Sequence, residues 1–181
     1  MRYHQIVQKR RELSRPGFLT LADVGMDGPW VSPYQIISKS MTGPVLLANN
    51  WLDEQSITAN LPLLRKRGYL PGMVFNDVLD LINGFDRKAV YVTQVFHLVP
   101  DMRYGAKVSQ AAFDESFDTV TRHELLDRSV VALGKRAANM CRRHGVKCIE
   151  TRHPSHGGIT YADRAKLIGS AITQAGGLSG H

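Results

Sequence analysis

Cysteine is scarce in this chain, with only two among 181 residues. Cys141 and Cys148 match neither the spacing of a zinc-binding pair nor the Cys-x-x-Cys pattern of a redox centre. This scarcity excludes the disulfide-rich secreted scaffolds and predicts reduced thiols that pack as small apolar groups. We therefore expect a cytoplasmic protein.

Long apolar runs are also missing. No stretch of the sequence is long and apolar enough to cross a bilayer. The first residues lack the apolar core of a secretory signal, because Lys9, Arg10 and Arg11 interrupt it. These absences predict a protein that is neither exported nor inserted in a membrane.

Acidic residues are outnumbered, with 16 Asp and Glu against 23 Lys and Arg and a net charge of +7. A basic protein favours polyanionic partners such as nucleic acid. Several basic residues cluster near the C-terminal third of the sequence: Lys135, Arg136, Arg142, Arg143, Lys147 and Arg152. They either neutralise phosphates of DNA or form an ordinary solvated helix face.

Apolar runs rich in β-branched residues alternate with helical patterns along most of the chain. The predicted strands cover residues 44–48, 89–99, 129–133 and 146–149. The predicted helices cover residues 3–13, 54–67 with an interruption at Pro62, 74–83, 111–126, 135–144 and 160–175. Residues 14–44 are expected to form loops, with a short extended piece at 34–37.

Strands separated by helices favour parallel pairing with right-handed crossovers. We therefore predict an α/β protein, a three-layer α/β/α sandwich around a four-stranded parallel sheet. A hydrophobic content of 43% is enough to fill one core, so residues 1–175 are expected to form a single domain. The Gly-rich residues 176–181 are expected to form a flexible tail.

A polar loop, Arg152-His153-Pro154-Ser155-His156-Gly157-Gly158, follows the last predicted strand and precedes the last helix. Open parallel sheets bind ligands at the carboxyl ends of their strands, where this loop would lie. Thr160 can cap the following helix together with Asp163. The position and composition are typical of a catalytic loop.

Four segments in order resemble motifs of the uracil-DNA glycosylase superfamily. The first is Val45-Leu46-Leu47-Ala48-Asn49-Asn50, and the second is Val90-Tyr91-Val92-Thr93-Gln94. The third spans residues 129–139, and the fourth is Arg152-His153-Pro154-Ser155, which is similar to the family's His-Pro-Ser loop. The resemblance covers residues 40–172 and implies the uracil-DNA glycosylase fold and a DNA partner.

The resemblance implies a role for each motif residue. His153 would hydrogen-bond the carbonyl oxygen of the departing base, and Asn50 would hold the attacking water. Gln94 would bind the edge of the base, with Asn49 and Phe75 as further base contacts. The residues expected to contact DNA are Ser155, His156, Gly157, Gly158, Lys135, Arg136, Arg142, Arg143 and Arg152.

The chain also departs from the family's pattern. Where the most active branch has Gly-Gln-Asp-Pro-Tyr, residues 48–52 read Ala-Asn-Asn-Trp-Leu, so no carboxylate is aligned. Asp53, three positions further along the chain, is a candidate replacement for this carboxylate, although its side chain need not face the same pocket. The leucine wedge of the family is absent, or is supplied by Ile159 or Tyr161, which suggests a single-stranded or unusual substrate.

Other chemistries fit the residues less well. His144, His153, His156 and Glu150 do not have the spacing of a helix-borne metal site, so we expect no metal. Gly134-Lys135 lacks both the upstream glycine and the following Ser or Thr of a phosphate loop, which disfavours ATP. We expect no cofactor of any kind.

Each of these candidate site residues also has a purely structural interpretation. His153 would then be an ordinary loop histidine, Asn49 and Asn50 a simple turn, and Phe75 part of the helix core.

The predicted function is hydrolysis of the glycosidic bond of a flipped uracil-type or modified pyrimidine in DNA. One competitor binds DNA or a modified base without cleaving it, because the carboxylate is missing. The other acts on free nucleosides or nucleotides, and is favoured if the basic residues are scattered.

Overall fold

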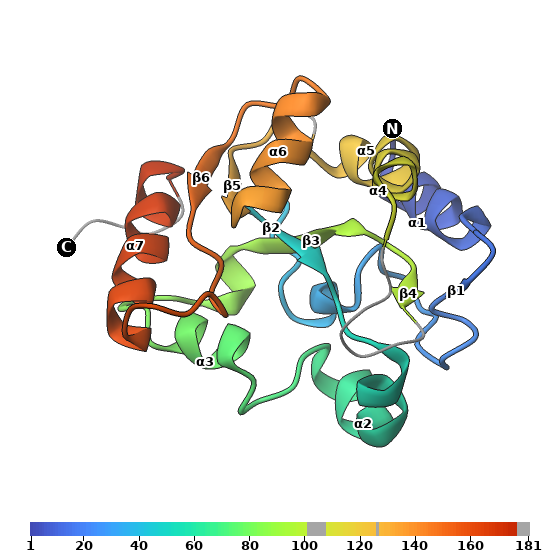
Figure 1. The fold of residues 1–181 in the computed structure, drawn as a ribbon, viewed down its shortest axis with the longest axis horizontal. Helices are drawn as coiled ribbons and strands as arrows, with labels where there is room; N and C mark the ends of the chain where they lie inside the picture. Colours follow the sequence, from blue (N-terminus) through green and yellow to red (C-terminus); the bar gives the residue numbers. More distant parts are fainter. Residues whose placement is uncertain (101–107, 126, 177–181) are drawn as a thin grey trace.

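The computed structural model describes residues 1–100, 108–125 and 127–176 (Figure 1). Its centre is a parallel sheet of four strands: β2 (Val45–Asn50), β3 (Tyr91–Phe96), β5 (Val130–Leu133) and β6 (Ile149–Thr151). The strand order is β3-β2-β5-β6. This confirms the predicted α/β class and the four-stranded parallel sheet.

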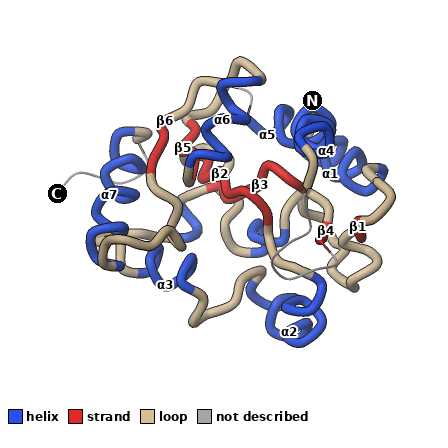
Figure 2. The backbone as a smooth tube through the Cα atoms, viewed as in Figure 1, coloured by secondary structure: helices blue, strands red, loops and turns tan. Residues whose placement is uncertain are grey.

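Helices cover both faces of the sheet, as Figure 2 shows in blue around the red strands. Side chains of successive strand residues point to opposite faces, so Leu46 belongs to one apolar core and Leu47 to the other. The core around Leu46 includes residues of α2 (Glu54–Arg67), α3 (Val74–Asp80) and α7 (Tyr161–Gln174). The core around Leu47 includes residues of α1 (Tyr3–Glu12), α4 (Gln110–Ser116), α5 (Arg122–Leu125) and α6 (Lys135–Arg143). The arrangement is consistent with three layers.

Short elements complete the described chain. β1 (Phe18–Leu19) pairs antiparallel with β4 (Val99–Pro100), away from the main sheet. The remaining elements are the 3-10 helices η1 (Pro33–Ile36) and η2 (Arg87–Ala89) and the π-helical turn η3 (Phe117–Thr121). In the ranges that the structure describes, no helix combines the length and the apolar character needed to span a membrane.

The structure differs from the sequence prediction in several places. The helix predicted over 74–83 ends at Asp80, and the strand predicted over 89–99 is β3, which ends at Phe96 before the separate β4. Residues 34–37 are not extended, because Pro33 at the first helical position starts the 3-10 turn of η1. The last strand begins at Ile149 rather than at 146, because the Val146 amide donates to the Cys141 carbonyl and prolongs the turn after α6. The helix predicted over 111–126 is interrupted by η3, and residue 126 lies outside the described residues.

Other local predictions are confirmed. The helix at 54–67 is interrupted at Asn60, two residues before Pro62, where φ is −128°. Thr160 caps α7 by accepting a hydrogen bond from the Asp163 amide. Of the predicted C-terminal tail, only Gly176 belongs to the described residues.

The strand order creates a crevice at one end of the sheet. From β2 the chain continues to β3, which lies on one side of β2. It then crosses to β5, which lies on the other side of β2. In open α/β sheets, ligands bind at such a reversal, outside the carboxyl ends of the two strands. Asn50 ends β2 and Gly134 follows β5, so both lie beside this crevice.

Candidate functional site

A cavity of about 300 Å³ lies at the carboxyl ends of the strands. Asn50 from the end of β2, Phe75 from α3, and His153 and Ser155 from the loop after β6 all line it. Its volume is at the lower end of the range of ligand pockets, about 300 to 1,000 Å³. The structure thus brings these four residues, together with Asp53, from the candidates singled out in the sequence to one cavity.

The loop that carries His153 is held from behind by Arg164 of α7. The Arg164 side chain is buried, and its Nη1 donates to the Pro154 carbonyl oxygen over 2.6 Å. The loop closes on itself, because the His156 amide donates to the His153 carbonyl oxygen over 2.9 Å. The Arg164 guanidinium, which forms no ion pair with a carboxylate among the described residues, thus stabilises the backbone of the loop.

Gly134 supports His153 from the side of β5. Its backbone has φ +97° and ψ 164°, a combination that is nearly exclusive to glycine. A Cβ atom added to Gly134 would lie 2.9 Å from the Cβ of His153, closer than such atoms approach. The absence of a side chain at Gly134 therefore makes room for the His153 backbone and ring.

The hydrogen bonds of His153 fix which ring nitrogen carries the proton. Its Nδ1 accepts from the Ser155 amide over 3.1 Å, so the neutral ring is protonated at Nε2. Burial, reinforced by the charge of His156, lowers the pKa of His153 from its ordinary value. The ring is 5.6 Å from that of Phe75, at 51°. A neutral imidazole held in this way offers an Nε2–H donor to a bound ligand.

The Asn50 amide is oriented by its neighbour. Asn49 Nδ2 donates to Asn50 Oδ1 over 2.8 Å, which leaves this oxygen one further lone pair. The Asn49 Oδ1 is buried, and no hydrogen-bond partner for it is found among the described residues. Asn49 itself does not line the cavity, so it orients Asn50 rather than contacting a ligand there.

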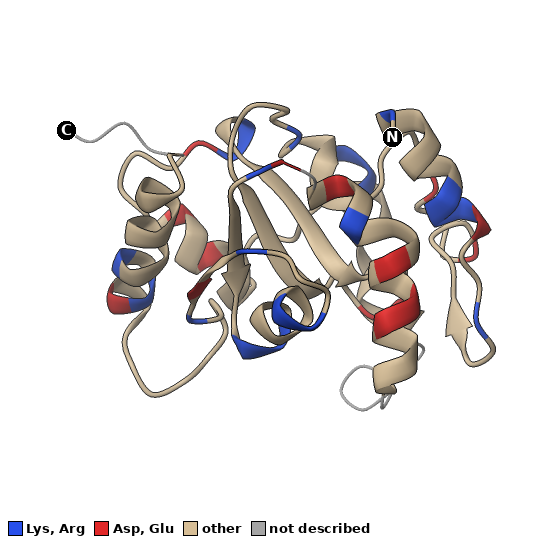
Figure 3. Cartoon of the chain, turned by 90° about the horizontal axis from the view of Figure 1, so that it is seen from above, with Lys and Arg blue, Asp and Glu red and all other residues tan. Residues whose placement is uncertain are grey.

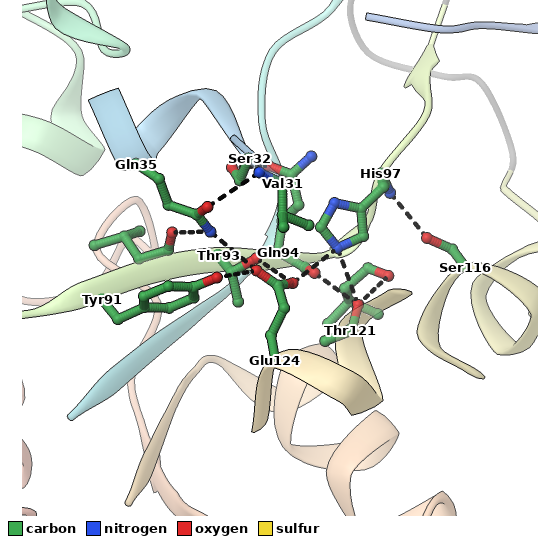
Figure 4. Close-up of polar contacts among 12 residues, drawn as sticks. Val31, Ser32, Gln35, Tyr91, Thr93, Gln94, His97, Ser116, Thr121 and Glu124 are labelled. Atoms are coloured by element: carbon green, nitrogen blue, oxygen red, sulfur yellow. Dashed lines mark hydrogen bonds and ion pairs between the residues drawn. The ribbon is translucent and has the colours of Figure 1, made fainter. Parts of the chain in front are cut away.

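Gln94 does not line this cavity. Its side chain is 1% exposed, and its Oε1 accepts from Ser32 Oγ over 3.0 Å (Figure 4). A buried amide in this largely apolar strand needs a hydrogen-bond partner. In the structure that partner is Ser32, which lies 62 residues earlier in the chain. The base contact predicted for Gln94 is therefore not available in this conformation.

A buried carboxylate organises the core next to Gln94. Glu124 accepts hydrogen bonds from the Tyr91 hydroxyl at 2.6 Å, the Thr93 hydroxyl at 2.7 Å and Gln35 Nε2 at 2.9 Å (Figure 4). Gln35 is in η1, next to Tyr34, which lines the cavity. The network ties η1 to β3, because Gln35 Nε2 also donates to the Val92 carbonyl oxygen, and so it supports one wall of the cavity.

Sequence reasoning missed Tyr34 as a cavity residue. Its ring stacks on that of Phe75 with a centroid separation of 5.8 Å and an angle of 27°. Burial raises the pKa of the Tyr34 hydroxyl well above its ordinary value, so the group is a neutral hydrogen-bond donor. The sequence predicts a short extended piece at 34–37 within a loop-rich stretch, and no spacing or motif distinguishes Tyr34 from other tyrosines of the chain.

The predicted DNA-contacting residues fall into separate groups. Arg142 pairs with Glu150 at 2.8 Å, and Arg143 pairs with Asp114 at 2.7 Å. Arg136 stacks over the Phe113 ring at 4.9 Å. Figure 3 shows basic and acidic segments interspersed over the molecule. The charges of Arg142 and Arg143 are therefore partly neutralised by carboxylates of the protein itself.

Lys135, Arg152 and His156 line a second groove, of about 690 Å³, between β6 and α7. His153 lines this groove as well as the smaller cavity, so the two openings adjoin at this residue. Gly157 and Gly158 are exposed in the same loop. The groove therefore presents three basic side chains beside the cavity that contains Asn50.

Comparisons with known proteins identify no relative of this chain. The chain matches no protein-family model, and neither a curated protein nor a solved structure is significantly similar to it. In the described parts of the chain, no group of three or more His, Cys, Asp or Glu side chains is placed to hold a metal ion.

Proposed function

We propose that this protein is a glycosylase of the uracil-DNA glycosylase type, which hydrolyses the N-glycosidic bond of a uracil-like or modified pyrimidine turned out of DNA. The observation that carries the proposal is that Asn50 and His153, about 100 residues apart in the chain, line one cavity with aromatic walls. Further support comes from the parallel sheet, which is the class of fold that the resemblance implies.

The chemistry follows from the side chains of the cavity. As the bond between the sugar C1′ and the base nitrogen breaks, its electron pair moves onto the base and negative charge collects on a carbonyl oxygen. The Nε2–H of neutral His153 donates to that oxygen, which stabilises the leaving base. The rings of Phe75 and Tyr34 offer an apolar surface for stacking the base. The Oδ1 of Asn50 accepts a hydrogen bond from the attacking water.

The adjoining groove suits the phosphates on either side of the extruded nucleotide. Lys135 and Arg152 supply positive charge there, and His156 supplies a ring nitrogen, although Glu150 also lines the groove. Ser155 lines the adjoining cavity, and Gly157 and Gly158 are exposed in the same loop, where their backbone amides are available. Arg142 and Arg143 contribute less, because each is already paired with a carboxylate. A short basic groove favours a single strand or a locally opened duplex over a long contact with regular duplex DNA.

A second candidate is hydrolysis of free nucleosides or nucleotides. The pairing of Arg142 with Glu150 and of Arg143 with Asp114 favours it, because a scattered basic surface holds DNA less strongly. The same cavity and the same His153 would then act on a substrate without flanking phosphates.

One assay separates these functions. The protein is incubated with single- and double-stranded oligonucleotides that contain uracil or modified pyrimidines, followed by alkaline cleavage, and in parallel with the free nucleosides. We expect strand scission that falls by at least about 100-fold in His153→Ala, the usual effect of removing such a donor, and markedly in Asn50→Ala. The exposed His4 of α1 provides the control His4→Ala, which should retain full activity. Turnover of nucleosides alone would favour the second candidate, and binding without scission would refute both.

A further inference from the structure

Asp53 lies in the same cavity as Asn50 and His153. Among the described residues that line this cavity, it is the only one with a carboxylate. Its place in the sequence, three residues after Asn50, left open whether it faces the same pocket. The structure answers that question, because the chain turns sharply between β2 and α2 and returns Asp53 to the cavity.

The turn that places Asp53 is rigid. Trp51 and Leu52 are buried, and the indole Nε1 of Trp51 donates to the Gly68 carbonyl oxygen at the far end of α2 over 3.0 Å. Asp53 is the N-cap of α2, with φ −82° and ψ 163°. The start and the end of α2 are thus connected, and the carboxylate is held at a fixed point of the cavity wall.

The carboxylate is oriented by Ser56. Oδ1 accepts from the Ser56 amide over 2.8 Å, and Oδ2 accepts from the Ser56 hydroxyl over the longer distance of 3.2 Å. Each carboxylate oxygen has more than one acceptor site, so Oδ2 retains capacity for a further donor. The helix cap by itself does not require a charge, because asparagine and serine cap helices as well as aspartate.

We propose that Asp53 is a catalytic residue of the glycosidic reaction, and that it supplies the carboxylate missing at position 50. This inference rests on the proposed function. The base leaves with the electron pair of its bond to C1′, and the sugar acquires positive charge opposite the carboxylate of Asp53. The oxygen of the water held by Asn50 forms the new bond to C1′, and the proton that the water loses passes to Asp53 Oδ2. That proton then leaves to the departed base or to solvent, which restores the carboxylate.

Separate roles for Asn50 and Asp53 account for the absence of an aligned carboxylate in residues 48–52. An amide positions water but accepts no proton at neutral pH, whereas a carboxylate does both. The negative charge of Asp53 also stabilises the positive charge that develops on the sugar. Asn50 and Asp53, three residues apart, therefore share the work that a single aspartate would perform.

The test uses the variant Asp53→Asn, because asparagine retains the cap and removes the charge. In single-turnover assays on the best oligonucleotide substrate, the rate of base release should fall by about 100-fold or more, the typical contribution of a general base. The pH profiles of base release by the two proteins should differ in shape, because only the wild type has a general base at this position. Thermal unfolding of the two proteins should coincide.

A matched control is Asp86→Asn. Asp86 is also an N-cap, accepting from the Lys88 amide over 2.8 Å, and it is exposed and outside the cavity. Its variant should keep the wild-type rate and pH profile. Asp53→Ser, which also preserves a cap, serves as a second variant if Asp53→Asn does not fold.

The outcomes separate the inference from the proposed function. If wild type releases base and both Asp53 variants do so at the wild-type rate, the role of Asp53 is refuted while the glycosylase function stands. If wild type releases no base from any oligonucleotide or nucleoside, the proposed function fails and the role of Asp53 fails with it. A selective loss in the Asp53 variants, with an unchanged Asp86 control, supports the inference.

Discussion

Replacing Gly134 by alanine tests whether the close approach of β5 to the His153 loop controls activity. The added Cβ would lie 2.9 Å from the Cβ of His153, and 3.6 Å from both its Cα and its Cδ2. The nearest of these atoms, the Cβ of His153, is attached directly to the backbone, so the loop itself must move. A shift of a catalytic group by about 1 Å can cost about 100-fold in rate. We therefore expect a large loss of activity in Gly134→Ala.

The substitution also strains the backbone. Alanine at φ +97° costs about 1 to 3 kcal/mol, so Gly134→Ala should be less stable to urea. Gly145 provides a matched control at the other end of α6. It has φ +70°, and no atom lies within 4 Å of an added Cβ. Gly145→Ala should lose about 1 to 2 kcal/mol of stability and keep its activity.

The comparison requires two measurements for each variant, urea unfolding and the single-turnover rate of base release. We expect both variants to be destabilised and Gly134→Ala alone to be slow. Equal rates in the two variants would refute the view that Gly134 positions His153, because the two share the backbone strain and differ in the contact.

Two further predictions concern the same loop. The proton NMR titration of His153 should give a pKa below the ordinary value of 6.5. As the pH falls, the unfolded chain then binds this proton at a higher pH than the folded protein does. The contribution of His153 to stability should therefore be complete above about pH 6.5 and diminish below it. An ordinary or raised pKa would contradict the partly buried, neutral imidazole. Arg164→Met should cost about 1 to 3 kcal/mol in urea unfolding, because it leaves the Pro154 carbonyl unpaired. It should also slow base release, whereas an unchanged rate would show that the loop keeps its course without Arg164.

The sheet was predictable because local sequence determines most of it. Residues 45–48 and 130–133 are apolar and fully buried, which is the pattern of central parallel strands. The edge strand β6 is only partly buried and contains Glu150, so its apolar pattern is weak and its start was misplaced by three residues. The π-helical turn η3 has no comparable local signal, because its sequence is compatible with a regular helix.

The candidate site was predictable only in part. Asn50 ends β2 and His153 follows β6, and these parallel strands lie on either side of β5, so both residues lie at the same edge of the sheet as a consequence of topology. The orientation of Gln94 depends on Ser32, which is distant in sequence and belongs to a segment without regular pattern. The pairing of Arg143 with Asp114 is likewise a tertiary contact, so a count of basic residues overstated the positive surface.

The central claim is that the cavity shared by Asn50 and His153 cleaves a base from its sugar. Its most direct test is chromatographic detection of the free pyrimidine after incubation with single-stranded oligonucleotides that contain uracil or modified pyrimidines. We predict release of free base by the wild-type protein and none above background by His153→Ala of equal stability. Equal release by the two proteins, or no release from any substrate, would contradict the claim.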